Sequence, residues 1–397
     1  MKQTAKRQIA PIFVAALCIC GMTHNQGGRQ LLSPLLLAIQ ADFGLTHFQS
    51  STLMTVFFAV YASVQAFVGM LTRLAGRRRI LVFSTTAYAI VLILTSVVNN
   101  YETLMVLQAT GALAAGAYFI TGLFIISNLS KGSKYKGLIM GLYLSSTSLG
   151  AVLSSGVSGF ALKHWTWRAG YLAWGLVGVT IGLLMLRYLP EDTELVEGGD
   201  SKTQRPVLSR GAINIAYALL VISLMLDSIK VWGLSTFLCS FLSEAKGFTQ
   251  ASAAALYSVI RAIGVLGQTT VGIMVESMGK LKSAILTTGL GALVICLPLL
   301  NYGRPFLIIT LAIYGFVTPM AFGSLIASIN ETIPSESWDL ATGFANGLSF
   351  VGAAVGPAAV GRMIDAAGFN AAFLSISALS ALSCVVAYFA WRANSSH

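Results

Sequence analysis

Five ionisable residues lie inside long apolar stretches of the chain, where a charged side chain is costly. They are His24, Arg29, Asp227, Lys230 and Arg261. A charge surrounded by hydrocarbon usually faces a water-filled cavity or an oppositely charged partner. Three of the five are cations, so together they predict a cavity of net positive charge. The planar fork of arginine fits a carboxylate or phosphate group, which indicates an anionic ligand.

The roles within this group have two open interpretations. Asp227 and Lys230 are three residues apart and would share one face of a helix. They form either a mutually neutralising structural pair, or a working pair in which Lys230 holds the anion and Asp227 carries a coupling proton. Arg29 either faces the substrate or extends its side chain to the membrane–water interface on the outer side.

Polar and aromatic residues of the same stretches would complete the site. Gln268 follows Arg261 by seven residues and lies on nearly the same helix face. The set that we predict to bind substrate is Arg29, Lys230, Arg261, Gln65, Gln268, Tyr61 and Tyr257.

The sequence indicates no catalytic or metal site. The four histidines are dispersed, and the five cysteines lie in apolar runs without the spacing of metal ligands. No Walker sequence occurs, so the use of ATP is not indicated. We therefore expect that the protein is not an enzyme and needs no cofactor or metal. If its function requires energy, we expect a gradient of an ion or solute to supply it.

The composition places the chain in a membrane. It is 56% hydrophobic and only 10% charged, with a mean hydropathy of +0.77, whereas soluble domains carry about 25% charged residues. Lipid must therefore surround most of the surface. The net charge of +11 comes from cations in short turns between apolar runs, which membrane topology explains. We expect no binding of nucleic acid.

Twelve apolar segments can be traced, each long enough for a membrane-spanning helix. A polar stretch at 190–210 separates six from six and predicts a linker between an N-terminal bundle (1–189) and a C-terminal bundle (211–397). The segments are 9–40, 47–72, 80–98, 103–128, 138–162, 169–189, 211–243, 250–275, 283–301, 305–329, 341–364 and 371–391.

The distribution of Lys and Arg predicts the orientation. With the N-terminus inside, 16 of these residues fall in inside turns and 5 in outside turns, which agrees with the excess of cations in cytoplasmic loops. Both chain ends and the linker are then cytoplasmic, in the inner or plasma membrane.

A basic hairpin occurs twice, at Gly69–Arg79 and again 203 residues later at Gly272–Lys282. Both copies have glycine at the first and eighth places and a basic residue at the ninth and eleventh. The same offset pairs His24 with Asp227, so His24 joins it as a candidate for proton coupling. Two like halves in one orientation predict a substrate site between them, near the bilayer midplane. The hairpin residues that we assign to gating are Gly69, Arg73, Gly76, Arg77, Gly272, Glu276, Gly279 and Lys280.

The two hairpins, the twelve spans and the repeat together resemble the major facilitator superfamily (MFS) over the whole chain. The resemblance implies an all-α membrane fold of two pseudo-symmetric six-helix bundles that move by alternating access. In this family the fifth place of the hairpin usually holds an acid that helps to lock the outward-facing state. The second copy has that acid, Glu276, whereas the first has Arg73, so the resemblance places the latch at Glu276.

Arg261 gives the chain some similarity to the oxalate/formate and monocarboxylate carriers of the superfamily, which have an arginine on the eighth helix. There it lies four residues before the hairpin glycine, a place that Gln268 occupies here. The drug/proton antiporters usually have an arginine in the fourth helix, where this chain has Leu107, and a glycine-proline pattern in the fifth, where it has no proline.

We therefore predict a monomeric secondary transporter for a small organic anion, a carboxylate. It would work by proton symport or by exchange for another anion. Two alternatives remain: efflux of drugs or of a neutral or zwitterionic metabolite by proton antiport, and a non-transporting membrane receptor or sensor on the same fold.

Overall fold

The structure is a computed structural model that describes residues 11–130, 135–192, 214–300, 303–334 and 338–395. All regular structure in these ranges is helical. Ten helical stretches are long and apolar enough to cross a membrane. The first span is broken into two shorter helices and is not among these ten. The last of the ten contains two spans joined at Gly368, so the total is twelve. The predicted all-α fold of twelve membrane-spanning helices is confirmed.

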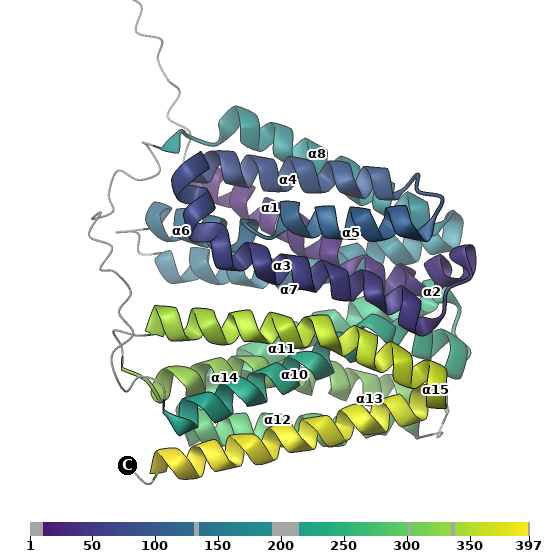
Figure 1. Cartoon of the computed structure of the whole chain (residues 1–397), viewed down its shortest axis with the longest axis vertical. Coiled ribbons are helices and arrows are strands. Elements are labelled where there is room, and N and C mark those ends of the chain that lie inside the picture. Colours follow the sequence, from purple (N-terminus) through teal and green to yellow (C-terminus); the bar gives the residue numbers. More distant parts are fainter. Residues whose placement is uncertain (1–10, 131–134, 193–213, 301–302, 335–337, 396–397) are drawn as a thin grey trace, which may run out of the picture.

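The first six spans form the upper part of the molecule in Figure 1, here called the N-half (residues 11–192). Two of these spans are broken. The helices are α1 (Pro11–Gln30) continued by α2 (Leu32–Phe43), α3 (His47–Ala75), α4 (Arg77–Thr95), α5 (Tyr101–Ala115) continued by α6 (Tyr118–Leu129), α7 (Lys136–His164) and α8 (Trp167–Tyr188).

The last six spans form the lower part of the molecule, here called the C-half (residues 214–395; Figure 1). Most of the predicted linker, 190–210, lies outside the described residues, and the exact domain limits stay a prediction. The helices are α10 (Ile215–Ser240) with the π-helical turn η1 (Phe241–Ala245), α11 (Gln250–Met278), α12 (Lys280–Cys296) with the 3-10 turn η2 (Leu297–Leu299), α13 (Arg304–Val317) continued by α14 (Met320–Glu331), and α15 (Trp338–Ser395).

Both basic hairpins turn at a glycine with positive φ. Gly76, between α3 and α4, has a φ of 83°, and Gly279, between α11 and α12, has a φ of 86°. A residue with a side chain rarely adopts this conformation, so the glycine at the eighth place is a requirement of the turn. The two turns lie at the end of the molecule on the left of Figure 1, here called the hairpin end. The opposite end is called the far end.

Three spans break near the middle, two of them at a proline and one at a glycine. Pro34 has no N–H to donate to the carbonyl of Gln30, and α1 ends at Gln30. Pro319 likewise separates α13 from α14. In the fourth span α5 ends before Gly116, whose carbonyl instead accepts a hydrogen bond from the Gln65 amide at 2.9 Å. These breaks free backbone carbonyls close to the boundary between the halves.

At the far end the halves are closed on one another along two helix pairs. Where α3 meets α15, the Thr55 hydroxyl donates to the Ala354 carbonyl at 2.8 Å. Where α7 meets α11, the Ser258 hydroxyl donates to the Val152 carbonyl at 2.7 Å. Both pairs join an N-half helix to a C-half helix, so they hold the far end shut.

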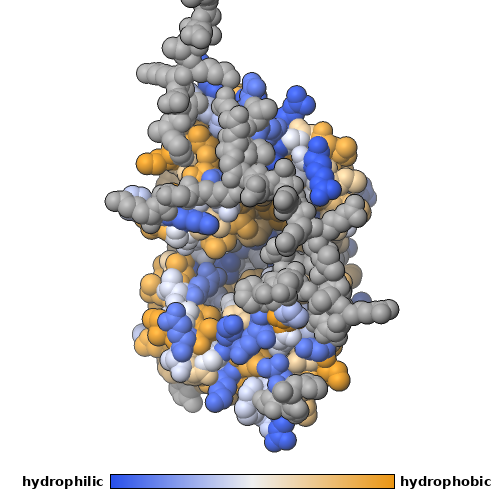
Figure 2. Space-filling model, turned by 90° about the vertical axis from the view of Figure 1, so that its left-hand side faces the viewer, coloured by the Kyte–Doolittle hydropathy of each residue, from blue (hydrophilic) through white to orange (hydrophobic). Residues whose placement is uncertain are grey.

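At the hairpin end, α7 and α15 do not pack closely against the described residues of the opposite half. A Cβ added at Gly141 on α7 or at Gly347 on α15 would meet no described atom within 4 Å. Gly141 lies seven residues before Ser148 and Gly347 seven before Ala354, so both glycines are on the faces that contact the other half further along. Figure 2 looks onto the hairpin end and shows the surface hollowed between the halves. The structure is therefore open at the hairpin end.

Candidate functional site

Arg29 lies in the last turn of α1, directly before the break that Pro34 causes. Its side chain is buried at the boundary between the halves. The guanidinium carbon is 5.6 Å from the centre of the Phe58 ring, 5.5 Å from that of Tyr61 and 4.8 Å from that of Trp232. One amino group donates to the Gln26 side-chain oxygen, whereas the buried Nε atom has no hydrogen-bond partner among the described residues.

The rings around Arg29 come from both halves and touch one another. The centre of the Phe58 ring on α3 is 4.4 Å from that of Trp232 on α10, and Tyr61 lies 5.1 Å from Phe350 on α15. We call Phe58, Tyr61, Trp232 and Phe350 the aromatic cluster. Cation–π attraction stabilises the guanidinium there, but the rings provide no negative charge to neutralise it. Arg29 therefore faces the boundary between the halves, and its contact with substrate stays a prediction.

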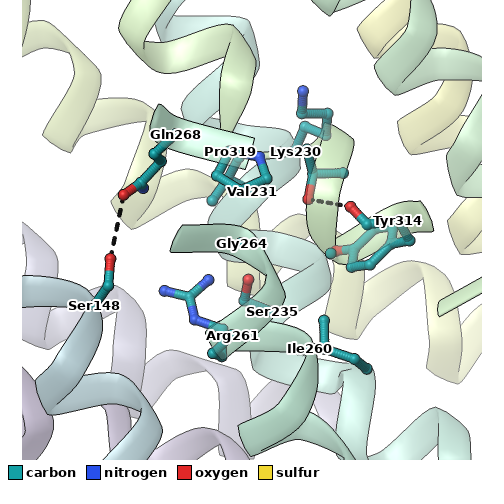
Figure 3. A pocket seen from close by; sticks show the side chains of 12 residues that line it. Ser148, Lys230, Val231, Ser235, Ile260, Arg261, Gly264, Gln268, Tyr314 and Pro319 are labelled. Carbon is teal, nitrogen blue, oxygen red and sulfur yellow. Dashed lines mark hydrogen bonds between the residues drawn. The ribbon is translucent and has the colours of Figure 1, made fainter. Parts of the chain in front are cut away.

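Arg261 lies on α11 and is partly exposed. It lines a pocket between α7, α10, α11 and the α13–α14 break (Figure 3). The guanidinium carbon is 5.9 Å from the centre of the Tyr257 ring. Polar groups of the same pocket come from Ser148, Ser235, Gln268 and Tyr314.

Arg29 and Arg261 give the boundary two positive charges, and these repel one another. Among the described residues, the aspartates and glutamates in ion pairs are paired with His47, Arg168 or Lys230, and none is paired with Arg29 or Arg261. Two arginines without a carboxylate partner, in a region of low dielectric, favour the arrival of an anion. The sequence predicted a cavity with three cations, whereas Lys230 is paired with Asp227. An anion site at the two arginines stays a prediction.

Asp227 and Lys230 form an ion pair inside the C-half. Both side chains are only 1% exposed. The Lys230 ammonium approaches Gly291 on α12, where an added Cβ would lie 3.2 Å from it. Lys230 contributes to the lining of the Arg261 pocket, but its ammonium points away from Arg261 (Figure 3). The pair thus lies behind the pocket, toward α12 and α15.

His24 occupies the corresponding position in the N-half. Its ring stacks on Trp174 of α8 at 6.0 Å, and its Nε2 atom is 3.2 Å from the Trp174 carbonyl oxygen. Gly178 leaves the space for the imidazole, because a Cβ there would lie 2.2 Å from Nε2. His24 and Asp227, paired by the repeat, therefore both point into the interior of their own half.

The other predicted polar residues lie at or beside the boundary, and two of them make hydrogen bonds between the halves. The Tyr257 hydroxyl donates to the Gln30 side-chain oxygen at 3.4 Å, and the Ser148 hydroxyl donates to that of Gln268 at 3.2 Å. Tyr61 belongs to the aromatic cluster, and Gln65 holds the α5–α6 break. All four thus lie at the boundary or at a break beside it. The contacts of Tyr257 and Gln268 must break if the halves separate.

Sequence reasoning did not assign Phe58, Gln26 and Ser148 to the site. Phe58 lies three residues before Tyr61 and seven before Gln65 on α3, so the helical spacing could have indicated it. Trp232 is the repeat counterpart of Arg29, which was a usable signal. No spacing rule could have indicated Gln26 and Ser148, because their roles depend on contacts made in the folded chain.

The hairpin residues have unequal surroundings. At the N-half hairpin, the Asp192 carboxylate accepts a hydrogen bond from the backbone N–H of Arg78 at 2.9 Å, at the start of α4. Arg77 lies over the Phe124 ring at 3.6 Å. Arg73 and Glu276 are both exposed at the open end, so the predicted latch at Glu276 stays a prediction for the state in which this end is closed.

The curated relatives of this chain include three at 23–25% identity. The inner membrane transport protein YnfM of Escherichia coli is 25% identical over 40% of this chain and 38% of that protein. The uncharacterized MFS-type transporter YwfA of Bacillus subtilis is 24% identical over 96% of this chain and 93% of that protein. The cis,cis-muconate transport protein of Acinetobacter baylyi is 23% identical over 88% of this chain and 86% of that protein.

Solved structures share the fold. A bacterial homolog of the human lysosomal transporter Spinster superposes with a TM-score of 0.83 and 15% identity, covering 96% of this chain and 97% of that one. The family model described as Major Facilitator Superfamily matches residues 18–297 and 220–397. The chain therefore belongs to the Major Facilitator Superfamily.

Proposed function

We propose that this protein is a secondary transporter that carries a small organic anion, a carboxylate, across the membrane by alternating access. The observation that carries the proposal is the presence of Arg29 and Arg261 at the boundary between the halves, without a carboxylate partner among the described residues. A substrate carboxylate would supply the missing negative charge and accept hydrogen bonds from Arg29 Nε, which lacks a partner.

The body of the substrate would contact the aromatic cluster. Flat unsaturated groups stack favourably on aromatic rings, and the cluster spans both halves. The relative that transports cis,cis-muconate is named for an unsaturated dicarboxylate, which supports an organic acid as the substrate class here. The similarity to oxalate/formate carriers, suggested by Arg261, remains part of the proposal.

The movement would be a rocking of residues 1–189 against residues 211–397 about the linker at 190–210. Closed contacts at the far end and free glycine faces at the hairpin end support this movement. The distribution of Lys and Arg supports a cytoplasmic position for the hairpin end and both termini. The state described is then inward-open, and the transporter acts as a monomer.

Coupling to a proton or to exchange for a second anion completes the proposal. Asp227 and His24 are the candidate proton carriers, each buried in its own half. Efflux of an amphipathic drug is the second candidate, favoured by the aromatic cluster, but such a substrate gives the two arginines no counter-charge.

Uptake of radiolabelled mono- and dicarboxylates into proteoliposomes tests the proposal. We expect Arg29→Gln and Arg261→Gln each to lower uptake at least tenfold, because each removes a charged hydrogen-bond donor worth about 1.5–3 kcal/mol. Arg187→Gln, at an exposed arginine of α8, is the matched control and should retain uptake. Uptake that survives both site variants would place the anion elsewhere.

A further inference from the structure

His47 occupies an unusual position at the far end. It is the first residue of α3 in the N-half, and both of its ring nitrogens face carboxylates of the C-half. Nδ1 is 2.9 Å from Asp365 Oδ1 on α15, and Nε2 is 3.3 Å from Glu244 Oε1 on η1. The three side chains are 21–35% exposed, so water on the far side can exchange protons with them.

The two contacts can both be hydrogen bonds in one protonation state only. A neutral imidazole has a single N–H, so one of its nitrogens would present a lone pair to a carboxylate oxygen. The imidazolium donates from both nitrogens and adds a positive charge between two negative ones. The closed far end therefore binds a proton at His47 more tightly than an open far end, where the carboxylates have moved away.

Asp365 strengthens the same junction through the backbone. Its carboxylate accepts from the N–H of His47 at 3.0 Å and from that of Phe48 at 2.8 Å, and so caps the positive end of α3. The helices approach closely here, because a Cβ added at Gly361 would lie 2.7 Å from the His47 carbonyl oxygen. A movement that opens the far end must therefore separate His47 from Asp365.

Arg362, Arg168 and Lys246, charged groups near this end, do not replace His47. The Arg362 side chain lies over the Phe48 ring, 5.9 Å from its centre. Arg168 is paired with Asp42 within the N-half, and Lys246 lies over the Phe241 ring within the C-half. Within the described part of the chain, Glu244 and Asp365 are the charged groups that contact His47 itself, and both favour its protonated form.

We propose that His47, Glu244 and Asp365 form a proton-operated latch that closes the far end when His47 is protonated. The latch rests on the proposed alternating access and adds its regulation. While the far end is closed, His47 is open to the far side, so it senses the pH of that compartment. Under the predicted orientation, acid outside the cell would favour the inward-open state.

The sign and size of the effect follow from linkage. Closing takes up a proton, so acidification favours closure and a rise in pH favours opening. An isolated imidazole titrates near pH 6.5, and a single linked proton can change the ratio of closed to open molecules by at most about tenfold per pH unit.

Electron–electron distance measurements on the full transporter in lipid nanodiscs test the latch. Spin labels at Asn99, in the α4–α5 turn, and at Asn370, after the bend in α15, are exposed on opposite halves at the far end. They would be introduced as cysteines after replacement of the five native cysteines. The wild-type distance distribution should shift from short to long as the pH rises from 5 to 8.

Two variants of His47 and one control show whether His47 causes the pH-dependent shift in distance. His47→Gln should lose the pH dependence, whereas His47→Arg, which stays charged, should favour the short distance at every pH. His164→Gln is the matched control, because His164 is exposed at the same end beside Phe160 and Trp165. It should respond to pH as the wild type does.

Two outcomes overturn the latch. They are a wild-type distance distribution that is the same at pH 5 and pH 8, and a His47→Gln protein that keeps the wild-type response. Either result leaves the proposed anion transport intact, because that proposal is measured separately by uptake. Conversely, loss of carboxylate selectivity would overturn the proposed function and would leave the pH dependence of the far end unchanged.

Discussion

The Arg29 guanidinium lies 4.8 Å from the centre of the Trp232 ring, and the two residues occupy the same position in the two halves of the chain. One half thus provides the charge and the other the aromatic face that covers it. Because the contact crosses the boundary between the halves, any rocking movement that separates them must alter the surroundings of Arg29. This contact links the proposed binding site directly to the conformational change.

A double-mutant cycle measures that link. Desolvated cation–π contacts are worth about 2 kcal/mol, so Arg29→Gln and Trp232→Leu should each weaken binding of a transported carboxylate. The double variant should lose at least 1 kcal/mol less than the sum of the two single losses, because both remove the same contact. Equilibrium binding to detergent-purified protein provides the four affinities. Strict additivity would show that Trp232 acts independently of Arg29.

The buried pair in the C-half should behave differently from the arginines. Asp227→Asn leaves the Lys230 charge buried without a partner, and breaking such a pair costs about 3–5 kcal/mol. We expect a marked loss of thermal stability in this variant. Replacing both residues, as Asp227→Asn with Lys230→Met, should restore the stability because no isolated charge remains.

The same double variant tests proton coupling through Asp227. It should lose accumulation driven by a proton gradient and keep exchange of internal for external substrate, which needs no net proton movement. The measurement is uptake into proteoliposomes under the two conditions. Accumulation at the wild-type level would show that the pair is purely structural.

The open glycine faces at the hairpin end predict a conformational lock. A tryptophan at Gly141 or Gly347 meets no described atom within 4 Å of the new Cβ, so the present state should tolerate it. Closure of the hairpin end would bring that bulk against the opposite half. We expect Gly141→Trp and Gly347→Trp to fold normally and bind substrate from the hairpin side, while net transport falls at least tenfold.

A glycine that is tightly packed inside the N-half provides the comparison for this lock. A Cβ at Gly150 would lie 2.4 Å from the Thr23 carbonyl oxygen, so Gly150→Trp should destabilise the protein itself. Thermal unfolding distinguishes the two effects. Rapid transport by Gly141→Trp would mean that the hairpin end need not close on α7.

The sequence was sufficient for the spans and the turns, because those depend on local properties. Runs of apolar residues determine the helices, and only glycine suits the positive φ at Gly76 and Gly279. Arg29 and Arg261 stood out because a charge within an apolar run is rare and needs a reason. These features can be seen within a window of about twenty residues.

The direction in which a side chain points could not be predicted from such a short stretch of sequence. Lys230 and Arg261 looked equivalent as cations in apolar segments, yet Lys230 faces the interior of the C-half and Arg261 faces the pocket. The difference arises from how α10 and α11 are rotated against their neighbours. His47 was missed as a functional residue for the same reason, because its partner Asp365 lies 318 residues away.

The most direct test of the central claim compares one substrate in two charge states. A transported carboxylate and its uncharged amide have nearly the same shape, so their difference reports recognition of the negative charge. Competition with the labelled carboxylate in proteoliposomes should show at least tenfold stronger inhibition by the acid than by the amide in the wild type. Arg261→Gln should reduce this preference severalfold. Equal inhibition by acid and amide in the wild type would contradict an anion site at Arg29 and Arg261.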